Sequence, residues 1–233
     1  MRRRVALLWR RDPRPGALVM FAGFAAVAFL CLLAAVIISP AFVALDERLS
    51  SAFNALQSPV LDRVFGVITH AGGGEVLAPL TVLVVAVLAS RRRRAEAVLF
   101  AATMSLGPLI GSGFKQLVER SRPALEFVRI TLPESYSFPS GHALASVLFF
   151  GLLGFIVVME ARTVRVRAWV LAACALAALL VGLSRVYLGV HWFGDIIASW
   201  ILGTGLLAAT NALYVVATAN QPAPGAEVTP DAT

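Results

Sequence analysis

Six long apolar stretches, almost free of charge, restrict what this sequence can fold into. The first, residues 16–39, has 24 residues without a charged side chain, and about 20 apolar residues in a helix suffice to cross a bilayer core. Backbone polar groups inside a bilayer must bond to one another, so each stretch is predicted to be a helix. The predicted spans are residues 16–39, 72–90, 96–117, 141–159, 168–184 and 195–218.

The composition supports a membrane protein over a soluble one. Of 233 residues, 59% are hydrophobic and 14% are charged, a balance that soluble domains of this size do not need. A net charge of +7 would suit nucleic acid, but the arginines cluster in short stretches between the apolar runs, as in membrane topology. We therefore expect an all-α integral membrane protein, a bundle of six transmembrane helices, with the lipid bilayer and not nucleic acid as its surroundings.

The positions of the basic residues predict the orientation of this bundle. Thirteen of the 20 basic residues fall on one side, and an excess of Lys and Arg marks the cytoplasmic side. We expect a basic cytoplasmic N-terminus at 1–15, a membrane domain at 16–218 and a disordered cytoplasmic tail at 219–233, in a bacterial inner or plasma membrane. The thirteen are six arginines among the first fifteen residues, Arg91–Arg94, Arg162, Arg165 and Arg167.

Three less apolar segments, residues 40–71, 120–139 and 184–195, would then face outward. In the first, polar and apolar residues alternate from Pro59 to Ile68, which predicts a short interfacial helix after the first span. Three groups of polar residues lie in or beside these segments and therefore on one membrane face.

The first motif, Lys115 to Pro123, offers cations. Lys115 and Arg122 are seven residues apart, so they share a helix face if the helix continues that far, while Pro123 disfavours helix at Arg122. Two cations on one face suit a phosphate, although basic side chains that merely anchor to head groups would look the same. We expect Arg120 and Arg129, which lack the spacing, to do only that.

The second motif, Pro139 to His142, directly precedes an apolar run. Ser140 is a good N-cap, and the unpaired N–H groups at a helix start favour an anion. Gly141 lets the backbone come close, and His142 in the first turn could protonate a leaving oxygen. A capped helix with an incidental histidine is the alternative for this motif alone.

The third motif, Ser184 to Asp195, holds an arginine, a histidine and an aspartate. His191 and Asp195 are four apart and can meet if Asp195 opens a helix. An aspartate that holds an imidazole in one tautomer makes the other ring nitrogen a better nucleophile, and Arg185 adds a charge suited to an anion. The alternative is a polar loop that only caps two helices.

Taken in order, KxxxxxxRP, PSGH and SRxxxxxHxxxD resemble the type 2 phosphatidic acid phosphatase superfamily, with every signature position present between residues 115 and 195. The resemblance implies a metal-independent lipid phosphatase, without cofactor, that acts through a phosphohistidine. His191 would attack phosphorus, Asp195 would orient it, and His142 would protonate the leaving oxygen and then activate water. The implied phosphate-binding residues are Lys115, Arg122, Ser140, Gly141 and Arg185.

The expected substrate is a membrane lipid phosphate or diphosphate. Undecaprenyl diphosphate ranks slightly before phosphatidic acid and phosphatidylglycerol phosphate, because the site faces outward and no large extra domain is present. Lipid phosphoryl transfer, a vanadate-dependent haloperoxidase and a transporter with a basic outer vestibule are the alternatives. Head group, oligomeric state and the roles of His70, Glu75 and the tail stay open at this point.

Overall fold

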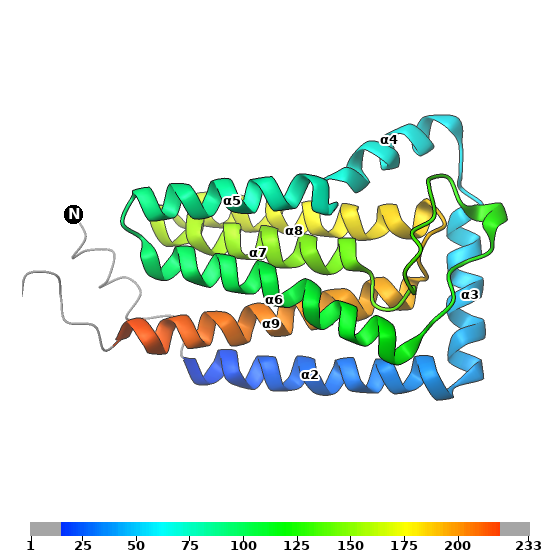
Figure 1. Cartoon of the computed structure of the whole chain (residues 1–233), viewed down its shortest axis with the longest axis horizontal. Coiled ribbons are helices and arrows are strands. Elements are labelled where there is room, and N and C mark those ends of the chain that lie inside the picture. Colours follow the sequence, from blue (N-terminus) through cyan, green and yellow to red (C-terminus); the bar gives the residue numbers. More distant parts are fainter. Residues whose placement is uncertain (1–14, 220–233) are drawn as a thin grey trace, which may run out of the picture.

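The computed structural model describes residues 15–219, and every regular element within that range is a helix (Figure 1). This confirms the all-α prediction. Apart from Pro15 and Ala219, which belong to helices, the predicted basic N-terminus and C-terminal tail lie outside the described residues. The helices are α2 (Pro15–Ile38), α3 (Pro40–Asn54), α4 (Pro59–His70), α5 (Gly74–Ser90), α6 (Arg94–Val118), η1 (Leu125–Phe127), α7 (Gly141–Glu160), α8 (Val164–Tyr187) and α9 (Phe193–Ala219).

Six helical stretches among the described residues are long and apolar enough to cross a membrane. Five of them are α2, α6, α7, α8 and α9, each within a few residues of its predicted span. The remaining stretch, Pro59–Ser90, joins α4 to α5 through a tight turn, so the predicted interfacial helix leads directly into the second span. Figure 1 shows α4 leaning away from the axis of α5.

Helix α3 was not predicted, and its start has a clear local cause. Ser39 is the N-cap, and its side chain accepts the N–H of Phe42 at 3.3 Å. Pro40 occupies the first helical position, where its fixed φ and missing N–H cost nothing. Pro40 therefore begins a new helix, and Figure 1 shows α3 crossing the end of the bundle, nearly perpendicular to α2.

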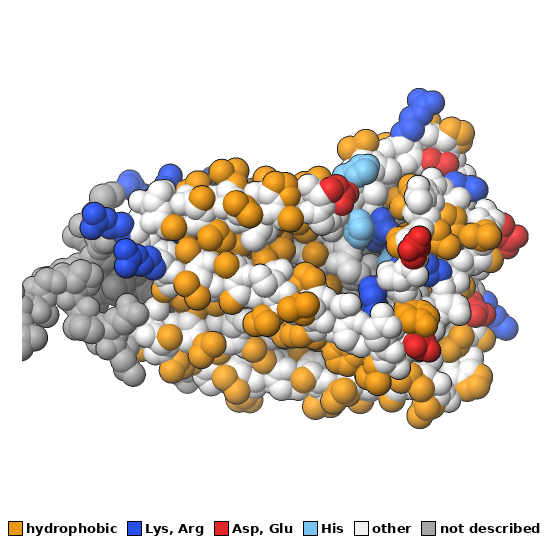
Figure 2. Space-filling view, viewed as in Figure 1, with side chains coloured by type: hydrophobic (Ala, Val, Ile, Leu, Met, Phe, Trp, Pro, Cys, Tyr) orange, Lys and Arg blue, Asp and Glu red, His pale blue; other side chains and the backbone are white. Residues whose placement is uncertain are grey.

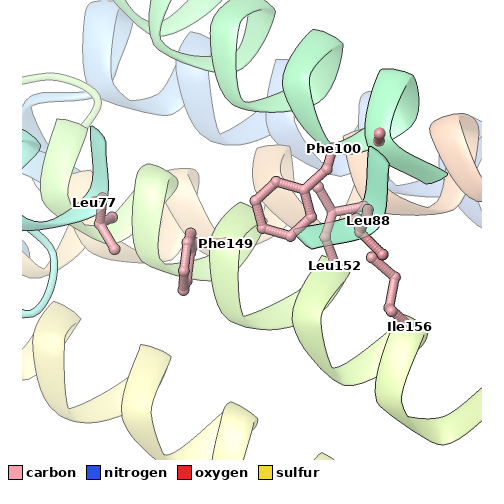
Figure 3. Close-up of a cluster of buried hydrophobic side chains, with 7 residues drawn as sticks. Leu77, Leu88, Phe100, Phe149, Leu152 and Ile156 are labelled. Atoms are coloured by element: carbon pink, nitrogen blue, oxygen red, sulfur yellow. The ribbon is translucent and has the colours of Figure 1, made fainter. Parts of the chain in front are cut away.

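The interior of the bundle is apolar and centres on α7, which packs against α5, α6, α8 and α9. Side chains from α5, α6 and α7 interlock in one cluster (Figure 3). Within it, the rings of Phe100 and Phe149 meet edge to face at 5.5 Å. Close packing of this kind is what stabilises helix association when lipid surrounds the bundle. The cluster comprises Leu77, Leu88, Ala97, Phe100, Phe149, Leu152 and Ile156.

The outer surface is apolar along the sides and charged at the ends. Figure 2 shows hydrophobic side chains over the middle of the visible face, and charged and histidine side chains gathered toward the end where α3 lies. Large apolar side chains such as Phe24, Val82 and Leu109 are exposed along the spans, as expected for contact with lipid. The chain is therefore an integral membrane protein.

The topology brings the three motifs to one end of the bundle. The end of α6, the start of α7, the end of α8 and the start of α9 all lie at the end crossed by α3 (Figure 1). The starts of α2 and α8, the α5–α6 turn and the end of α9 lie at the opposite end.

Candidate active site

His191 and Asp195 meet at the start of α9. Asp195 lies in the first helical turn, where its Oδ2 accepts the N–H of Trp192 at 3.0 Å, a bond that fixes the carboxylate to the helix start. The same oxygen lies 3.2 Å from Nδ1 of His191. His191 itself precedes the helix, so the pair forms across the helix boundary. Both side chains are buried, and Nε2 of His191 is left free for other partners.

Ser137 is a third member of this group that the sequence analysis missed. Its hydroxyl donates to Oδ2 of Asp195 and lies 3.3 Å from Nδ1 of His191. Its backbone N–H also bonds to the carbonyl of Arg120 at 2.9 Å. A serine two residues before the Pro139–His142 motif carried no spacing signal, and only the fold of the 119–140 loop brings it to Asp195.

Arg120 does not behave as the surface anchor that was expected. Its side chain is only 9% exposed, and its guanidinium binds Oδ1 of Asp195 at 2.7 Å through Nη1 and Oδ2 of Asp46 at 2.9 Å through Nη2. The prediction was wrong because an arginine near a membrane surface can also reach inward to a carboxylate. Arg129 is exposed, and its Nε lies 3.9 Å from Oδ2 of Asp62.

Arg122 lies against the nitrogen of His191 that Asp195 leaves free. Nη1 of Arg122 is 3.3 Å from Nε2 of His191 and donates to the carbonyl of Val190 at 2.6 Å. Its Nε donates to the carbonyl of Ser135 at 2.8 Å, which fixes the plane of the guanidinium. A fixed, planar cation at this place suits the oxygens of a phosphate bound to His191.

Lys115 and Arg122 converge, although not on one helix face. Helix α6 ends at Val118, and Glu119 adopts a left-handed conformation with φ 49°, so the helix does not continue to Arg122. Instead, Nζ of Lys115 and Nη2 of Arg122 both donate to the carbonyl of Tyr136. The 119–140 loop, and not a helical repeat, brings the two cations together.

Arg185 is the third cation, in the last turn of α8. It is buried, and its Nη1 donates to the hydroxyl of Thr69 on α4 at 2.7 Å. Its Nε has no hydrogen-bond partner among the described residues. A buried guanidinium with an unused donor is costly and can be satisfied by an anion.

The second motif forms the start of α7, as predicted. Ser140 is the N-cap, and its hydroxyl accepts the N–H of Ala143 at 3.5 Å. Gly141 is exposed, and His142 follows in the first turn, partly exposed and within electrostatic reach of Arg185. The first-turn N–H groups and His142 thus lie at the same end of the bundle as His191.

The turn before α5 packs against this motif. A Cβ at Gly72 would lie 2.3 Å from Cγ1 of Val181 and 3.1 Å from the carbonyl of His142, so only glycine allows this approach. His70 and Glu75 flank the turn, exposed, with Nδ1 and Oε1 3.4 Å apart.

The surroundings of His191 determine its protonation. Burial lowers the pKa of the His191 imidazole well below its ordinary value, and Arg185 and Arg122 act in the same direction, against the Asp195 carboxylate. The ring is therefore neutral near pH 7. A neutral imidazole with Nδ1–H held by a carboxylate presents the lone pair of Nε2, which is what a nucleophile requires.

Charge compensation at this site comes from side chains of Lys and Arg. Among residues 15–219, no group of three or more His, Cys, Asp or Glu side chains is placed to hold a metal ion. Arg122 lies beside Nε2 of His191, and Lys115 shares the carbonyl of Tyr136 with it. Arg185 is within electrostatic reach of both His142 and His191. The arrangement can bind an oxyanion, attack it with a nitrogen and supply a proton from a second histidine.

Comparison with known proteins gives matches over most of the chain. The sequence pattern of the PAP2 superfamily matches residues 96–219. The chain is 31% identical to phosphatidylglycerophosphatase B of Bacillus subtilis (strain 168) over 176 residues, covering 75% of this chain and 86% of that protein. It is 30% identical to the undecaprenyl-diphosphatase of Sulfolobus acidocaldarius over 167 residues, covering 70% of this chain and 75% of that protein.

Solved structures share the fold. The crystal structure of a transmembrane PAP2-type phosphatidylglycerolphosphate phosphatase from Bacillus subtilis superposes with a TM-score of 0.74 at 30% identity, covering 82% of this chain and 94% of that chain. The crystal structure of Aquifex aeolicus LpxE has a TM-score of 0.53 at 22% identity, covering 71% of this chain and 93% of that chain. The second likeness concerns the fold alone.

Proposed function

This chain belongs to the PAP2 superfamily and is a membrane lipid phosphatase, and we propose that it acts through a phosphohistidine on His191. The observation that carries the proposal is the placement of His191, with Nδ1 on Asp195 and Nε2 beside the guanidinium of Arg122. Such a nitrogen is oriented, neutral and next to a site for the anion that it must attack.

The first step transfers the phosphoryl group to the enzyme. The lone pair of Nε2 attacks phosphorus, a P–N bond forms, and the P–O bond to the lipid breaks in line with the attack. His142 supplies the proton that the departing lipid oxygen takes up. Asp195 accepts the Nδ1–H bond and stabilises the positive charge that the ring gains.

The second step returns the enzyme to its starting state. His142, now neutral, removes a proton from water as the water oxygen attacks phosphorus. The P–N bond breaks, and inorganic phosphate leaves, so that His191 is again a neutral imidazole. The two steps together consume one water and release one phosphate.

Lys115, Arg122 and Arg185 stabilise the transferring group, because its charge spreads over three oxygens. A hydrogen bond to a charged group contributes about 1.5–3 kcal/mol, part of which is already present when the substrate binds. Ser140 and Gly141 add the N–H groups at the start of α7, where the helix dipole favours an anion.

The proposed substrate is an amphiphile with a phosphate or diphosphate head. Its apolar tail stays in the bilayer beside the spans while the head group reaches the charged end of the bundle. The two relatives, a phosphatidylglycerophosphatase and an undecaprenyl-diphosphatase, suggest phosphatidylglycerol phosphate and undecaprenyl diphosphate as the first head groups to test. Phosphatidic acid completes the set.

We propose that the site faces the outside of the cell. The structure places the α5–α6 turn, with Arg91–Arg94, and the start of α8, with Arg165 and Arg167, at the end opposite the site. The positive-inside rule then assigns that opposite end, and both termini with it, to the cytoplasm.

A panel of lipid phosphates and diphosphates tests the function. Purified protein in detergent with EDTA is expected to release inorganic phosphate from at least one of them, and His191→Ala protein from none. In ¹⁸O-labelled water the released phosphate should carry one solvent oxygen. Phosphate release by His191→Ala at the rate of the unchanged protein would refute the mechanism. Transfer of the phosphoryl group to an acceptor lipid, without entry of a solvent oxygen, would indicate a transferase.

A further inference from the structure

Helix α3 carries a buried polar stripe that neither the motifs nor the 96–219 family match includes. Asp46, Ser50 and Asn54 are spaced by four and therefore share one helix face. Their exposed fractions are 3%, 0% and 3%. Burying three polar side chains on one face is unfavourable unless each is bonded, so their partners indicate what α3 does.

The stripe binds the backbone near both ends of the third motif. Asn54 donates through Nδ2 to the carbonyl of Val186 at 2.7 Å, at the end of α8. Ser50 accepts the N–H of Phe193 at 3.1 Å, and Oδ1 of Asp46 accepts the N–H of Gly194 at 2.9 Å. Those two N–H groups are orphans of the first turn of α9, so α3 caps the helix that carries Asp195.

Asp46 also reaches Asp195 through a shared cation. Nη1 and Nη2 of Arg120 lie 2.7 Å from Oδ1 of Asp195 and 2.9 Å from Oδ2 of Asp46. The arginine is therefore divided between two buried carboxylates. Taken together, the three charges sum to minus one.

That sum matters for the step proposed for His191, on which this inference rests. The imidazole becomes positive as Nε2 bonds to phosphorus, and a negative carboxylate at Nδ1 stabilises it. An arginine bound to Asp195 alone would cancel that charge. We propose that Arg120 and Asp46 are positioning residues: Arg120 aligns the carboxylate of Asp195, and Asp46 neutralises Arg120 so that Asp195 keeps its negative charge toward His191.

A double-mutant cycle tests the charge balance. Asp46→Asn changes the sum to zero, and Arg120→Gln changes it to minus two, whereas the double variant restores minus one. We expect each single variant to lower kcat about tenfold or more with KM within about twofold, because the change affects the transition state. The double variant still lacks the arginine that aligns Asp195, so its kcat should be no lower than that of Arg120→Gln alone, because Asp46 then has no arginine left to neutralise; this is strong non-additivity.

Two further variants separate positioning from simple packing. Ser50→Ala removes an uncharged cap on the same face of α3, and its effect on kcat should add to that of Arg120→Gln. Arg120→Lys keeps the charge and should retain more activity than Arg120→Gln at equal thermal stability in detergent. This comparison remains decisive if Asp46→Asn protein does not fold.

The outcomes are distinguishable from a failure of the proposed function. Active His191→Ala protein would overturn that function, whatever the cycle shows. Inactive His191→Ala together with additive losses for Asp46→Asn and Arg120→Gln, or with equal kcat for Arg120→Lys and Arg120→Gln, would overturn the positioning role alone.

Discussion

Nη1 of Arg122 lies 3.3 Å from Nε2 of His191, so a cation is held against the nitrogen proposed to attack phosphorus. Arg122 is fixed there by the carbonyls of Val190 and Ser135, and the fork of a guanidinium matches two phosphate oxygens. We expect Arg122→Gln to lower kcat/KM by about a hundredfold or more.

Arg122→Lys keeps the charge but not the forked shape of the guanidinium. Its kcat/KM should therefore lie between those of the unchanged protein and of Arg122→Gln. Initial rates of phosphate release from a lipid phosphate, measured for all three proteins at matched thermal stability in detergent, provide the check. Equal kcat/KM for the glutamine variant and the unchanged protein would mean that Arg122 only holds the loop.

A covalent intermediate should accumulate when His142 is replaced. With an aryl phosphate the leaving group needs no proton, so attack by His191 proceeds in His142→Gln protein, while release of the P–N intermediate by activated water is slowed. We expect a burst of phenolate of about one equivalent per enzyme. We also expect a phosphoryl label on the protein that is labile to acid and stable to alkali.

His142→Gln combined with His191→Ala is the matched control and should give neither burst nor label. Label that persists in this double variant would place the covalent bond on another residue.

His191 should stay neutral to an unusually low pH. Burial lowers its pKa, so the proton binds only at a lower pH than for an exposed histidine, and the nucleophile remains free above that point. The sequence contains three histidines, and His70→Gln with His142→Gln leaves His191 alone. Its ¹⁵N imidazole shifts in untagged protein should show the neutral ring at pH 6, below the ordinary pKa of about 6.5.

Replacing Asp195 in the same protein separates the effect of burial on the pKa of His191 from the effect of the Asp195 carboxylate. Asp195→Asn removes the group that acts against the burial effect, so the pKa of His191 should fall further. A His191 that is half-protonated near pH 6.5 would contradict the role given to burial.

The six spans could be predicted because length and apolarity are local properties of the sequence. The short helix at 59–68 was also within reach, since Ser58 and Pro59 mark its start as an N-cap and a first helical residue. Ser39 and Pro40 carry the same signal for α3. That helix was missed because its polar residues obscure the apolar pattern, although Asp46 and Ser50 already show the spacing of one helix face.

The residues outside the motifs that surround His191 and Asp195 could not be predicted from local sequence patterns. From the sequence, Arg120 was interpreted as a surface anchor, because its partners Asp46 and Asp195 are 74 and 75 residues away along the chain. Ser137 needs the fold of its loop to reach Asp195. The spacing of Lys115 and Arg122 predicted that the two residues share one helix face, yet α6 ends between them. The two side chains do converge, but through the loop and not along a helix.

Thr69 is expected to act on phosphate binding through Arg185, although it lies outside all three motifs. Its hydroxyl accepts Nη1 of Arg185 at 2.7 Å, while Nε of that arginine has no partner among the described residues. Thr69→Val keeps the shape but removes the acceptor, which leaves a second donor of the buried guanidinium unsatisfied or lets it turn away. Phosphate would then lose part of its fixed positive surroundings.

We expect Thr69→Val to weaken inhibition by inorganic phosphate or orthovanadate about tenfold, the loss of roughly one hydrogen bond to a charged group. Thr69→Ser restores the hydroxyl and should return the inhibition constant to within about twofold, which a packing defect at this buried position would not do. An inhibition constant for Thr69→Val equal to that of the unchanged protein would mean that the Thr69 hydroxyl has no part in holding Arg185.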